Sequence, residues 1–246
     1  MNSYDFVFIL NIMNIVITGA SRGIGKAIAE IFAGDKEAHT LFLSARNEAV
    51  LKNTAAALAT QFPQATIHYK AADLSRKEEA DILAEWILAI AIPNIIVNNA
   101  GSFIPGSTFN EPDGALENMI AANLYSAYYL TRALLPQMIE NKKGHVFNIC
   151  SIASLKAYSN GGAYSISKFA LAGYTQNLRE EMKPFGIKVT GVYPGATLTD
   201  SWSGSGIAPE RIMEVSDIAK MIYTAANLAP QSVVEDIVLR PQLGDL

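Results

Sequence analysis

Short apolar runs alternate with longer segments of helical periodicity along almost the whole chain, and this alternation constrains the fold more than any other feature. The runs are rich in Val and Ile and lie at residues 15–17, 41–43, 67–69, 95–97, 146–149, 189–192 and 237–239. Helical spacing fills the intervals at 24–32, 50–58, 82–90, 119–138, 164–182 and 218–228. Runs without polar alternation indicate strands covered on both faces, so the pattern predicts a doubly wound α/β fold with a parallel sheet.

Length and composition favour one enzyme-sized domain. The chain has 246 residues, half of them apolar, and no linker interrupts the pattern. The formal net charge of -4, with both signs interspersed, gives no cationic surface for nucleic acid. The single cysteine cannot form an internal disulfide and fits a reducing compartment, so we expect a cytoplasmic protein.

The N-terminal segment is apolar from residue 4 to residue 12. It is too short to span a bilayer and lacks a basic flank, and a signal-peptidase cut near Ala20 would destroy the first strand and its following turn. Neither membrane insertion nor secretion is therefore expected. Because Met13 directly precedes the first strand, we interpret residues 1–12 as an upstream extension or a misassigned start, and residues 13–246 as the folded domain.

A glycine-rich segment joins the first strand to the first helix. It reads TGASRGIG at residues 18–25. Glycines at such a turn let the backbone approach a pyrophosphate closely, and free N–H groups at the helix N-terminus meet its charge. Strand, loop and helix in this order predict a dinucleotide site. Its expected contacts are Gly19, Ser21, Arg22, Gly23, Ile24 and Gly25.

The GxxxGxG spacing of this loop resembles that of short-chain dehydrogenases/reductases, and the resemblance extends over nearly the whole chain. The family pattern places Asn-Asn-Ala-Gly after the fourth strand and Pro-Gly after the sixth, and both occur here, at 98–101 and 194–195. The resemblance implies a single-domain Rossmann fold with a seven-stranded, mostly parallel sheet. It also implies further cofactor contacts at Asp73, Leu74, Asn99, Ala100, Gly101, Pro194, Gly195 and Thr197. Asp73 could equally cap the helix that starts near Ser75.

The end of the second strand predicts the choice of cofactor. Folds that prefer NAD place an acidic residue there to hold the ribose hydroxyl. This chain instead has Arg46 and Asn47, and Arg22 lies in the glycine loop. Two guanidinium groups could converge on a 2′-phosphate, so NADP(H) is the expected cofactor.

Four polar residues form the predicted catalytic group: Asn123, Ser151, Tyr164 and Lys168. Tyr164 and Lys168 are four residues apart, which places both on one helical face, and a nearby ammonium would lower the pKa of the phenol. In the family, the serine polarises the substrate carbonyl, the tyrosine exchanges the proton, and the lysine also grips the nicotinamide ribose. The asparagine holds a water in the proton relay. The resemblance therefore implies an oxidoreductase that interconverts a ketone or aldehyde and an alcohol.

The sequence says least about the substrate. Its contacts are expected from the segment after Gly195, from residues near 102–108 and from the chain end. The segments 43–47 and 234–241 resemble sepiapterin-reductase-like bacterial members, in which a carboxylate near the C-terminus can anchor a pterin. Asp245 is a candidate for that anchor, or merely a terminal acid, and Trp202 could stack on a ring or only pack. One alternative is a 3-oxoacyl carrier-protein reductase, for which Lys142 and Lys143 are the available cations. A second is a non-catalytic NADP(H) sensor.

Other residues are interpreted as structural. Cys150 is expected to be a small buried hydrophobe. The three histidines are scattered without ligand spacing, so no metal site is expected. The helical segments 119–138 and 164–182 carry more apolar surface than one sheet face covers, and family members pair these helices between subunits. A homo-oligomer, either a dimer or a tetramer, is therefore expected. The other expected partner is the small carbonyl substrate.

Overall fold

Seven strands form one sheet in a computed structural model of the chain, which describes residues 12–199 and 206–246. The order is β3-β2-β1-β4-β5-β6-β7, and all the neighbouring strands are paired in parallel. The predicted doubly wound, seven-stranded fold is confirmed, with every pair parallel. The strands are β1 (Asn14–Thr18), β2 (Thr40–Ala45), β3 (Thr66–Ala71), β4 (Ile95–Asn98), β5 (Gly144–Ile149), β6 (Ile187–Pro194) and β7 (Asp236–Leu239).

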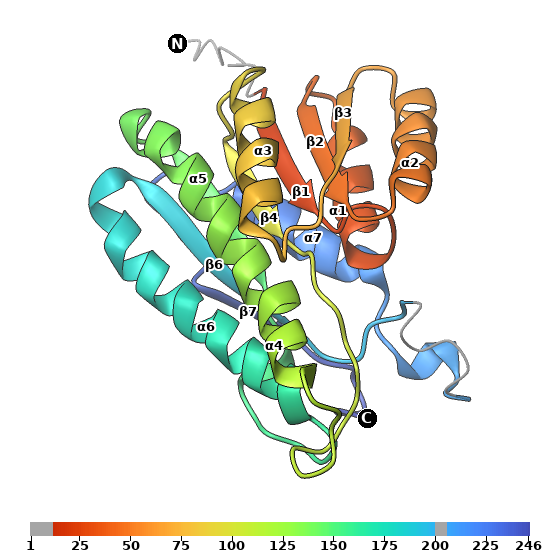
Figure 1. Ribbon diagram of the computed structural model, residues 1–246. Coiled ribbons are helices and arrows are strands. Elements are labelled where there is room, and N and C mark those ends of the chain that lie inside the picture. Colours follow the sequence, from red (N-terminus) through yellow and green to blue (C-terminus); the bar gives the residue numbers. More distant parts are fainter. Residues whose placement is uncertain (1–11, 200–205) are drawn as a thin grey trace, which may run out of the picture.

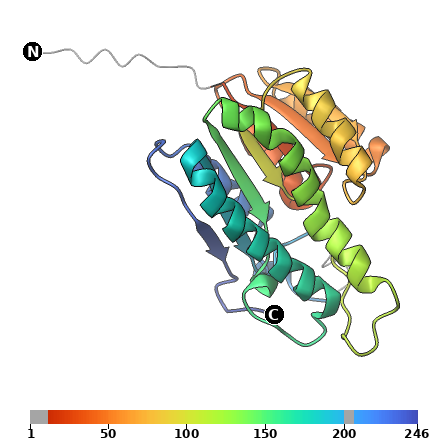
Figure 2. The same cartoon turned by 60° about the vertical axis from the view of Figure 1, so that its left-hand side comes forward.

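Helices cover both faces of the sheet (Figures 1 and 2). One face is covered by α1 (Gly23–Ala33), α2 (Glu48–Gln61) and α7 (Val215–Ala226). The other is covered by α3 (Lys77–Leu88), α5 (Ser126–Glu140) and α6 (Gly162–Met182). The short α4 (Ala115–Ile120) extends the α5 layer past the ends of the strands, beside the start of α6.

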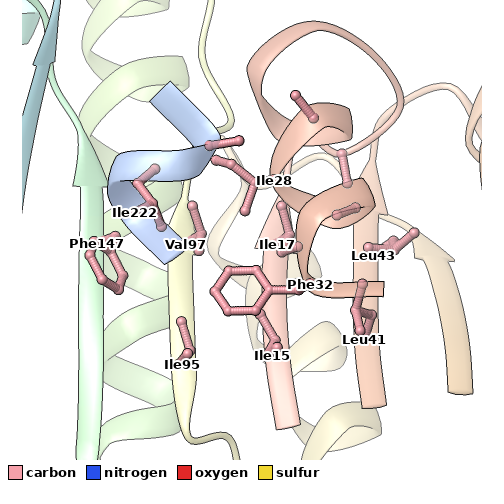
Figure 3. Close-up of a cluster of buried hydrophobic side chains, with 14 of the residues drawn as sticks. Ile15, Ile17, Ile28, Phe32, Leu41, Leu43, Ile95, Val97, Phe147 and Ile222 are labelled. Carbon is pink, nitrogen blue, oxygen red and sulfur yellow. The ribbon is translucent and has the colours of Figure 1, made fainter. Parts of the chain in front are cut away.

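Alternate residues of each strand supply two separate cores. In β1, Ile15 and Ile17 pack toward α1 and α7, whereas Val16 packs toward α3 and α5. Figure 3 shows the first core, where Phe32 of α1 and Ile222 of α7 lie over the central strands. Both faces need apolar side chains, which is why the strands appear in the sequence as uninterrupted apolar runs.

The strand order places a crevice beyond the carboxyl ends of two central strands, β1 and β4. The chain builds outward from β1 to β3 and then returns to add β4 on the other side of β1. The connections after β1 and β4 therefore diverge, and ligands of doubly wound sheets bind at this point, outside the carboxyl ends of the strands. The predicted glycine loop follows β1, and residues 98–101 follow or end β4.

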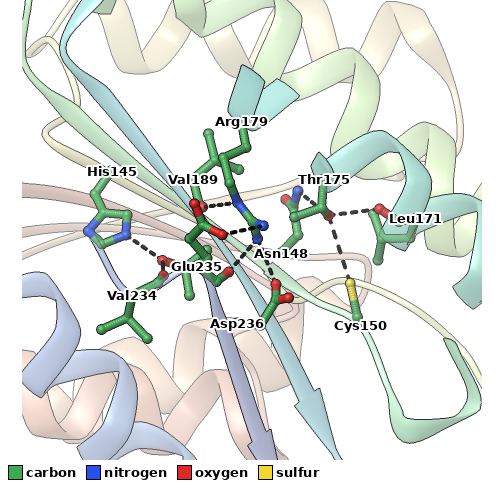
Figure 4. A network of polar contacts seen from close by, with 11 residues as sticks. His145, Asn148, Cys150, Leu171, Thr175, Arg179, Val189, Val234, Glu235 and Asp236 are labelled. Atoms are coloured by element: carbon green, nitrogen blue, oxygen red, sulfur yellow. Dashed lines mark hydrogen bonds and ion pairs between the residues drawn. The ribbon is translucent and has the colours of Figure 1, made fainter. Parts of the chain in front are cut away.

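A buried arginine ties α6 to the last two strands (Figure 4). The Arg179 Nε donates to the carbonyl oxygen of Val189 at 3.0 Å, and Nη2 lies 2.6 Å from Oδ1 of Asp236. The guanidinium also bonds the backbone oxygen of Glu235. These bonds fix the C-terminal half of α6 against β6 and β7, so the orientation of its N-terminal half depends on other contacts.

The predicted helix at 119–138 is interrupted. It consists of α4, a π-helical turn η1 (Ala121–Tyr125) and α5. A π-turn accommodates one extra residue in the helix, and such turns occur often at functional sites. Here the turn contains Asn123.

Two predictions fall partly or wholly outside the described residues. The N-terminal extension does so except for Ile12, and Trp202 does so entirely. Within residues 12–199 and 206–246, no helix combines the length and apolar character needed to cross a membrane.

Candidate active site

The glycine loop forms a tight turn at the end of β1. Gly19 has φ +62°, and a Cβ at position 25 would lie 2.4 Å from the carbonyl oxygen of Gly19. The backbone at position 19 therefore favours glycine, and the start of α1 packs so closely on the loop that only glycine fits at position 25. The N-terminus of α1 consequently faces the crevice between β1 and β4.

Asn99 locks the loop to the end of β4. Its Nδ2 donates to the carbonyl oxygens of Thr18 and Gly19 at 2.9 and 3.1 Å. The Thr18 hydroxyl accepts from the amides of Asn99 and Ala100 at 2.9 and 2.8 Å. The two motifs found separately in the sequence thus form one hydrogen-bonded unit.

A polar cavity of about 390 Å³ lies beside this unit. Ten of the predicted cofactor contacts line it: Gly19, Ser21, Arg22, Arg46, Asn47, Asp73, Leu74, Asn99, Ala100 and Gly101. The other predicted contacts do not: Gly23, Ile24, Gly25, Tyr164, Lys168, Pro194, Gly195 and Thr197. Lining residues that the sequence did not single out are Ser44, Ala45, Val50, Ala72, Ser75, Ala122 and Ser126.

The lining of this cavity fits a phosphorylated dinucleotide. Ser44 is buried at its edge, and its hydroxyl has no hydrogen-bond partner among the described residues. Arg22 and Arg46 both reach the cavity, whereas Asp73 is the one acidic residue among those that line it. An unpartnered buried hydroxyl needs a polar ligand group, and paired guanidinium groups suit a phosphate.

Asp73 and Asn47 also have structural partners. The Asp73 Oδ1 accepts from the backbone amide and hydroxyl of Ser75 at 3.2 and 2.8 Å. The Asn47 Oδ1 accepts from the amide of Val50 at 3.1 Å and caps α2. The cap interpretation of Asp73 is wrong, because α3 begins at Lys77 with Arg76 as its N-cap; Asp73 instead closes a turn with Ser75 and lines the cavity.

Tyr164 and Lys168 lie on the face of α6 that points into the fold, as their spacing predicts. The Lys168 Nζ is 5.9 Å from the centroid of the Tyr164 ring and donates to the carbonyl oxygen of Ile149 at 2.8 Å. Lys168 is only 7% exposed. Burial lowers the pKa of its ammonium to about 8.

The predicted lowering of the phenol pKa is wrong. Burial raises the pKa of Tyr164 to about 12, an increase that a hydrogen bond with the Ser151 hydroxyl only partly offsets. The amine of Lys168 lies over the ring face, 5.9 Å from the centroid, and binds a backbone carbonyl, and burial disfavours its charge. The geometry thus holds the phenol in its protonated form near neutral pH.

Ser151 sits where β5 ends and is fixed by its own turn. Its Oγ accepts from the amide of Ala153 at 3.1 Å, while its amide donates to the Ser154 hydroxyl at 3.2 Å. This reciprocal capping box begins the 3₁₀ turn η2 (Ile152–Ser154). Ser151, which lowers the pKa of the Tyr164 phenol, is therefore held by a rigid turn.

Asn123 is buried beside the same group. Its Nδ2 donates to the Ser167 hydroxyl at 2.8 Å and to the Ser102 carbonyl at 3.1 Å, and its Oδ1 accepts from the Ser102 amide at 2.8 Å. A Cβ at Gly101 would lie 2.6 Å from Asn123 Oδ1 and 3.9 Å from Lys168 Nζ. The structure thus brings all four predicted catalytic residues to one end of the sheet.

The predicted contacts after β6 shape the backbone there. The Gly195 amide donates to the carbonyl oxygen of Leu239 at 2.8 Å, next to Pro194, the last residue of β6. The Thr197 hydroxyl donates to the Gly195 carbonyl oxygen at 2.9 Å, and Thr197 pairs with Met213. These bonds fix the backbone where it leaves β6.

The connections after β4 and β5 present an apolar wall near Tyr164. Its first half lies in the segment 102–108, where substrate contacts were expected, whereas the second half was not predicted. The exposed side chains of this wall are Phe103, Ile104, Leu155 and Tyr158. The rings of Phe103 and Tyr164 pack edge to face with centroids 4.8 Å apart. No motif marks these residues, because loop side chains follow neither strand nor helix periodicity.

Glu111 is a second residue that sequence reasoning missed. Both of its carboxylate oxygens accept from the amide of Ala163, at 2.9 and 3.1 Å. The contact joins residues 52 positions apart, at the start of α6. Gly106 and Gly162 were the only sequence hint, and alone they read as ordinary turn residues.

The structure gives other surroundings to the residues that were considered for substrate binding or for carrier-protein binding. The Asp245 carboxylate is ion-paired with Arg240, and Arg211 donates to the carbonyl oxygens of Gly244 and Asp245. Lys142 and Lys143 precede β5, at the sheet edge opposite the site. Cys150 is buried as predicted, and burial raises the pKa of its thiol to about 11.

Comparison with known proteins gives consistent matches. The family model of the short chain dehydrogenases matches residues 13–207. An uncharacterized oxidoreductase of Staphylococcus aureus (strain MRSA252) is 30% identical over 92% of this chain and 96% of its own. A sepiapterin reductase of Chlorobaculum tepidum is 31% identical over 94% and 97% of the two chains.

Solved structures agree with the sequence matches. An alcohol dehydrogenase of the archaeon Thermococcus sibiricus, complexed with 5-hydroxy-NADP, has a TM-score of 0.85 at 26% identity and covers 94% of this chain and 97% of its own. The L-sorbose reductase of Gluconobacter frateurii, complexed with NADPH and L-sorbose, has a TM-score of 0.85 at 25% identity, over 94% and 95% of the two chains.

Proposed function

Because this chain belongs to the short-chain dehydrogenase family, we propose that it is an NADP(H)-dependent oxidoreductase whose Tyr164 transfers a proton to a substrate carbonyl oxygen. The observation that carries the proposal is the convergence of Ser151, Tyr164 and Lys168 beside a cavity lined by Arg22 and Arg46. The catalytic domain is residues 13–246.

NADP(H) fits the cavity better than NAD(H). Arg22 and Arg46 would hold the 2′-phosphate, while Ser44 offers a buried hydroxyl to the same region of the cofactor. The related structures that contain 5-hydroxy-NADP or NADPH support this choice. When bound, reduced nicotinamide supplies the hydride.

The chain's own residues handle the proton. Ser151, held by its capping box, donates a hydrogen bond that polarises the carbonyl, and Tyr164 gives its proton to the developing alkoxide. Lys168 stabilises the transient phenolate. Asn123 holds the backbone of Ser102 beside the relay that returns a proton to Tyr164. A phenol with a pKa of about 12 is protonated at neutral pH and can therefore donate to the developing alkoxide.

We further propose a sepiapterin-like substrate, a flat neutral carbonyl compound. The apolar wall suits a planar ring, and the relative from Chlorobaculum tepidum is a sepiapterin reductase. The anchor would come from this wall, because the Asp245 carboxylate is paired with Arg240. Lys142 and Lys143 lie at the opposite sheet edge, which removes the cations that favoured an acidic carrier protein.

A cytoplasmic homo-oligomer completes the proposal. A single cysteine fits a reducing compartment. The outer side of α5 and α6 carries exposed Tyr125, Ile166 and Phe169, a surface that a second copy could cover. Light scattering on the purified protein measures the mass, and a monomer would contradict this part of the proposal.

A substrate panel tests the function. Sepiapterin, an acetoacetyl thioester and a simple diketone are each incubated with NADPH or NADH, and oxidation of the cofactor is followed by absorbance. The highest kcat/KM with sepiapterin and NADPH is expected. Preference for the thioester would support the carrier-protein alternative, and NADPH binding without oxidation would support a sensor.

A further inference from the structure

The helix that contains Tyr164 begins without a local cap. Gly161 occupies the N-cap position and has no side chain to accept a bond, and the first turn contains no acidic residue. Helices normally satisfy their first N–H groups with a nearby Ser, Thr, Asp or Asn. Here Glu111, from the connection after β4, accepts from the amide of Ala163 with both oxygens. A carboxylate at this position also interacts favourably with the helix dipole.

Two glycines make room for this carboxylate. A Cβ at Gly162 would lie 2.0 Å from Glu111 Oε1, and a Cβ at Gly106 would lie 2.6 Å from Glu111 Cγ. Gly162 also has φ +37°, a conformation that side chains disfavour. The Glu111 side chain therefore passes through a gap that any larger residue at 106 or 162 would close.

The same two segments are joined on either side of Glu111. The Gly106 amide donates to the carbonyl oxygen of Asn160 at 3.1 Å, and the Ser107 hydroxyl lies 3.2 Å from Asn160 Oδ1. Phe103, from the same connection, packs against the Tyr164 ring. Residues 103–111 thus contact the ring of Tyr164 at one point and the backbone beside it at another.

We propose that Glu111 is a positioning residue: it clamps the N-terminus of α6 to the connection after β4 and so holds Tyr164 in place beside Phe103 and Ser151. The inference rests on the proposed reductase function. Arg179 fixes the far half of α6, and bonds from Lys168 and Ser165 anchor its near half. Loss of the clamp therefore loosens the first turn of the helix, which contains Tyr164. Small displacements of a proton donor reduce turnover strongly, by up to about 100-fold per ångström.

Three variants test the clamp. Glu111→Ala removes both hydrogen bonds, Glu111→Gln keeps an oxygen that can accept from Ala163, and Asp113→Ala removes an exposed acid from the same connection as a matched control. We measure kcat on the fastest panel substrate, the KM and Kd for NADPH, and hydrogen–deuterium exchange of peptides covering residues 159–166. The exchange measurement needs neither substrate nor cofactor.

In Glu111→Ala, kcat is expected to fall about 10- to 100-fold, with NADPH affinity within twofold of wild type and faster exchange at 159–166. Glu111→Gln should recover most of the loss, and Asp113→Ala should match wild type. Unchanged kcat in folded Glu111→Ala, a parallel loss of NADPH affinity, or a Glu111→Gln variant as defective as Glu111→Ala would overturn the proposal. If the wild type reduces no panel compound, the proposed function fails, and exchange alone decides the clamp: unchanged exchange in Glu111→Ala refutes it.

Discussion

The cofactor cavity and the apolar wall lie at the same end of the sheet but are built differently. The cavity is lined mainly by residues at the ends of β1, β2, β3 and β4, and short motifs mark many of them. The wall consists of exposed apolar side chains on two connections without a motif, joined by Glu111 and Asn160.

The contrast separates two kinds of specificity. Binding a phosphate needs backbone N–H groups and guanidinium groups at fixed places, which a strand-to-helix turn supplies locally. Recognising a carbonyl compound needs surface shape, which arises only when distant loops meet. If this division is right, substitutions in the cavity change cofactor use, and substitutions in the wall change substrate use.

The largest expected effect lies where the two regions meet. Tyr164→Phe removes only the hydroxyl, so kcat for carbonyl reduction should fall about 1000-fold while NADPH binding stays within twofold. Steady-state kinetics and cofactor fluorescence measure the two quantities. Reduction at a rate near that of wild type would show that another group supplies the proton.

The cavity alone should control cofactor choice. Arg46→Ala is expected to lower kcat/KM for NADPH about 30-fold, equivalent to about 2 kcal/mol, and to leave the value for NADH unchanged. Lys52→Ala is the control, because it removes an exposed cation of α2 outside the cavity. Equal losses with NADPH and NADH would mean that Arg46 does not contact the 2′-phosphate.

The buried amine predicts an alkaline limit to activity. The pKa of Lys168 is lowered to about 8, so its ammonium is present below that pH and is lost as the pH rises. Since kcat/KM reports groups of the free enzyme, it should fall about tenfold per pH unit above 8. Tyr164 titrates at about 12 and does not contribute to this limb. A limb with its midpoint near 10.5 would show that burial does not perturb Lys168.

The wall should produce the smallest and most selective effect. Phe103→Ala is expected to raise KM for sepiapterin about fivefold, because an aromatic contact contributes about 1 kcal/mol, and to leave KM for a small diketone unchanged. Phe109→Ala removes a ring that is 87% exposed on the same connection and serves as the control. A similar increase for both substrates would show that Phe103 acts on Tyr164 and not on the substrate ring.

The sequence determined the fold class and the cofactor end of the site. Uninterrupted apolar runs such as 15–17 predicted strands covered on both faces, and the start of the glycine loop, Asn99 and Arg46 line one cavity. These signals are readable because each depends on neighbours in the chain: a turn, a helix N-terminus, or a strand end.

Only the tertiary structure decided how the catalytic residues behave. The spacing of Tyr164 and Lys168 fixed their shared helical face, yet the direction of their pKa shifts depended on burial, which no spacing reveals. The cap on α6 comes from Glu111, 52 residues earlier. Burial and long-range contacts depend on segments that become neighbours only when the sheet has formed, so the sequence could name the reacting groups but not their environment.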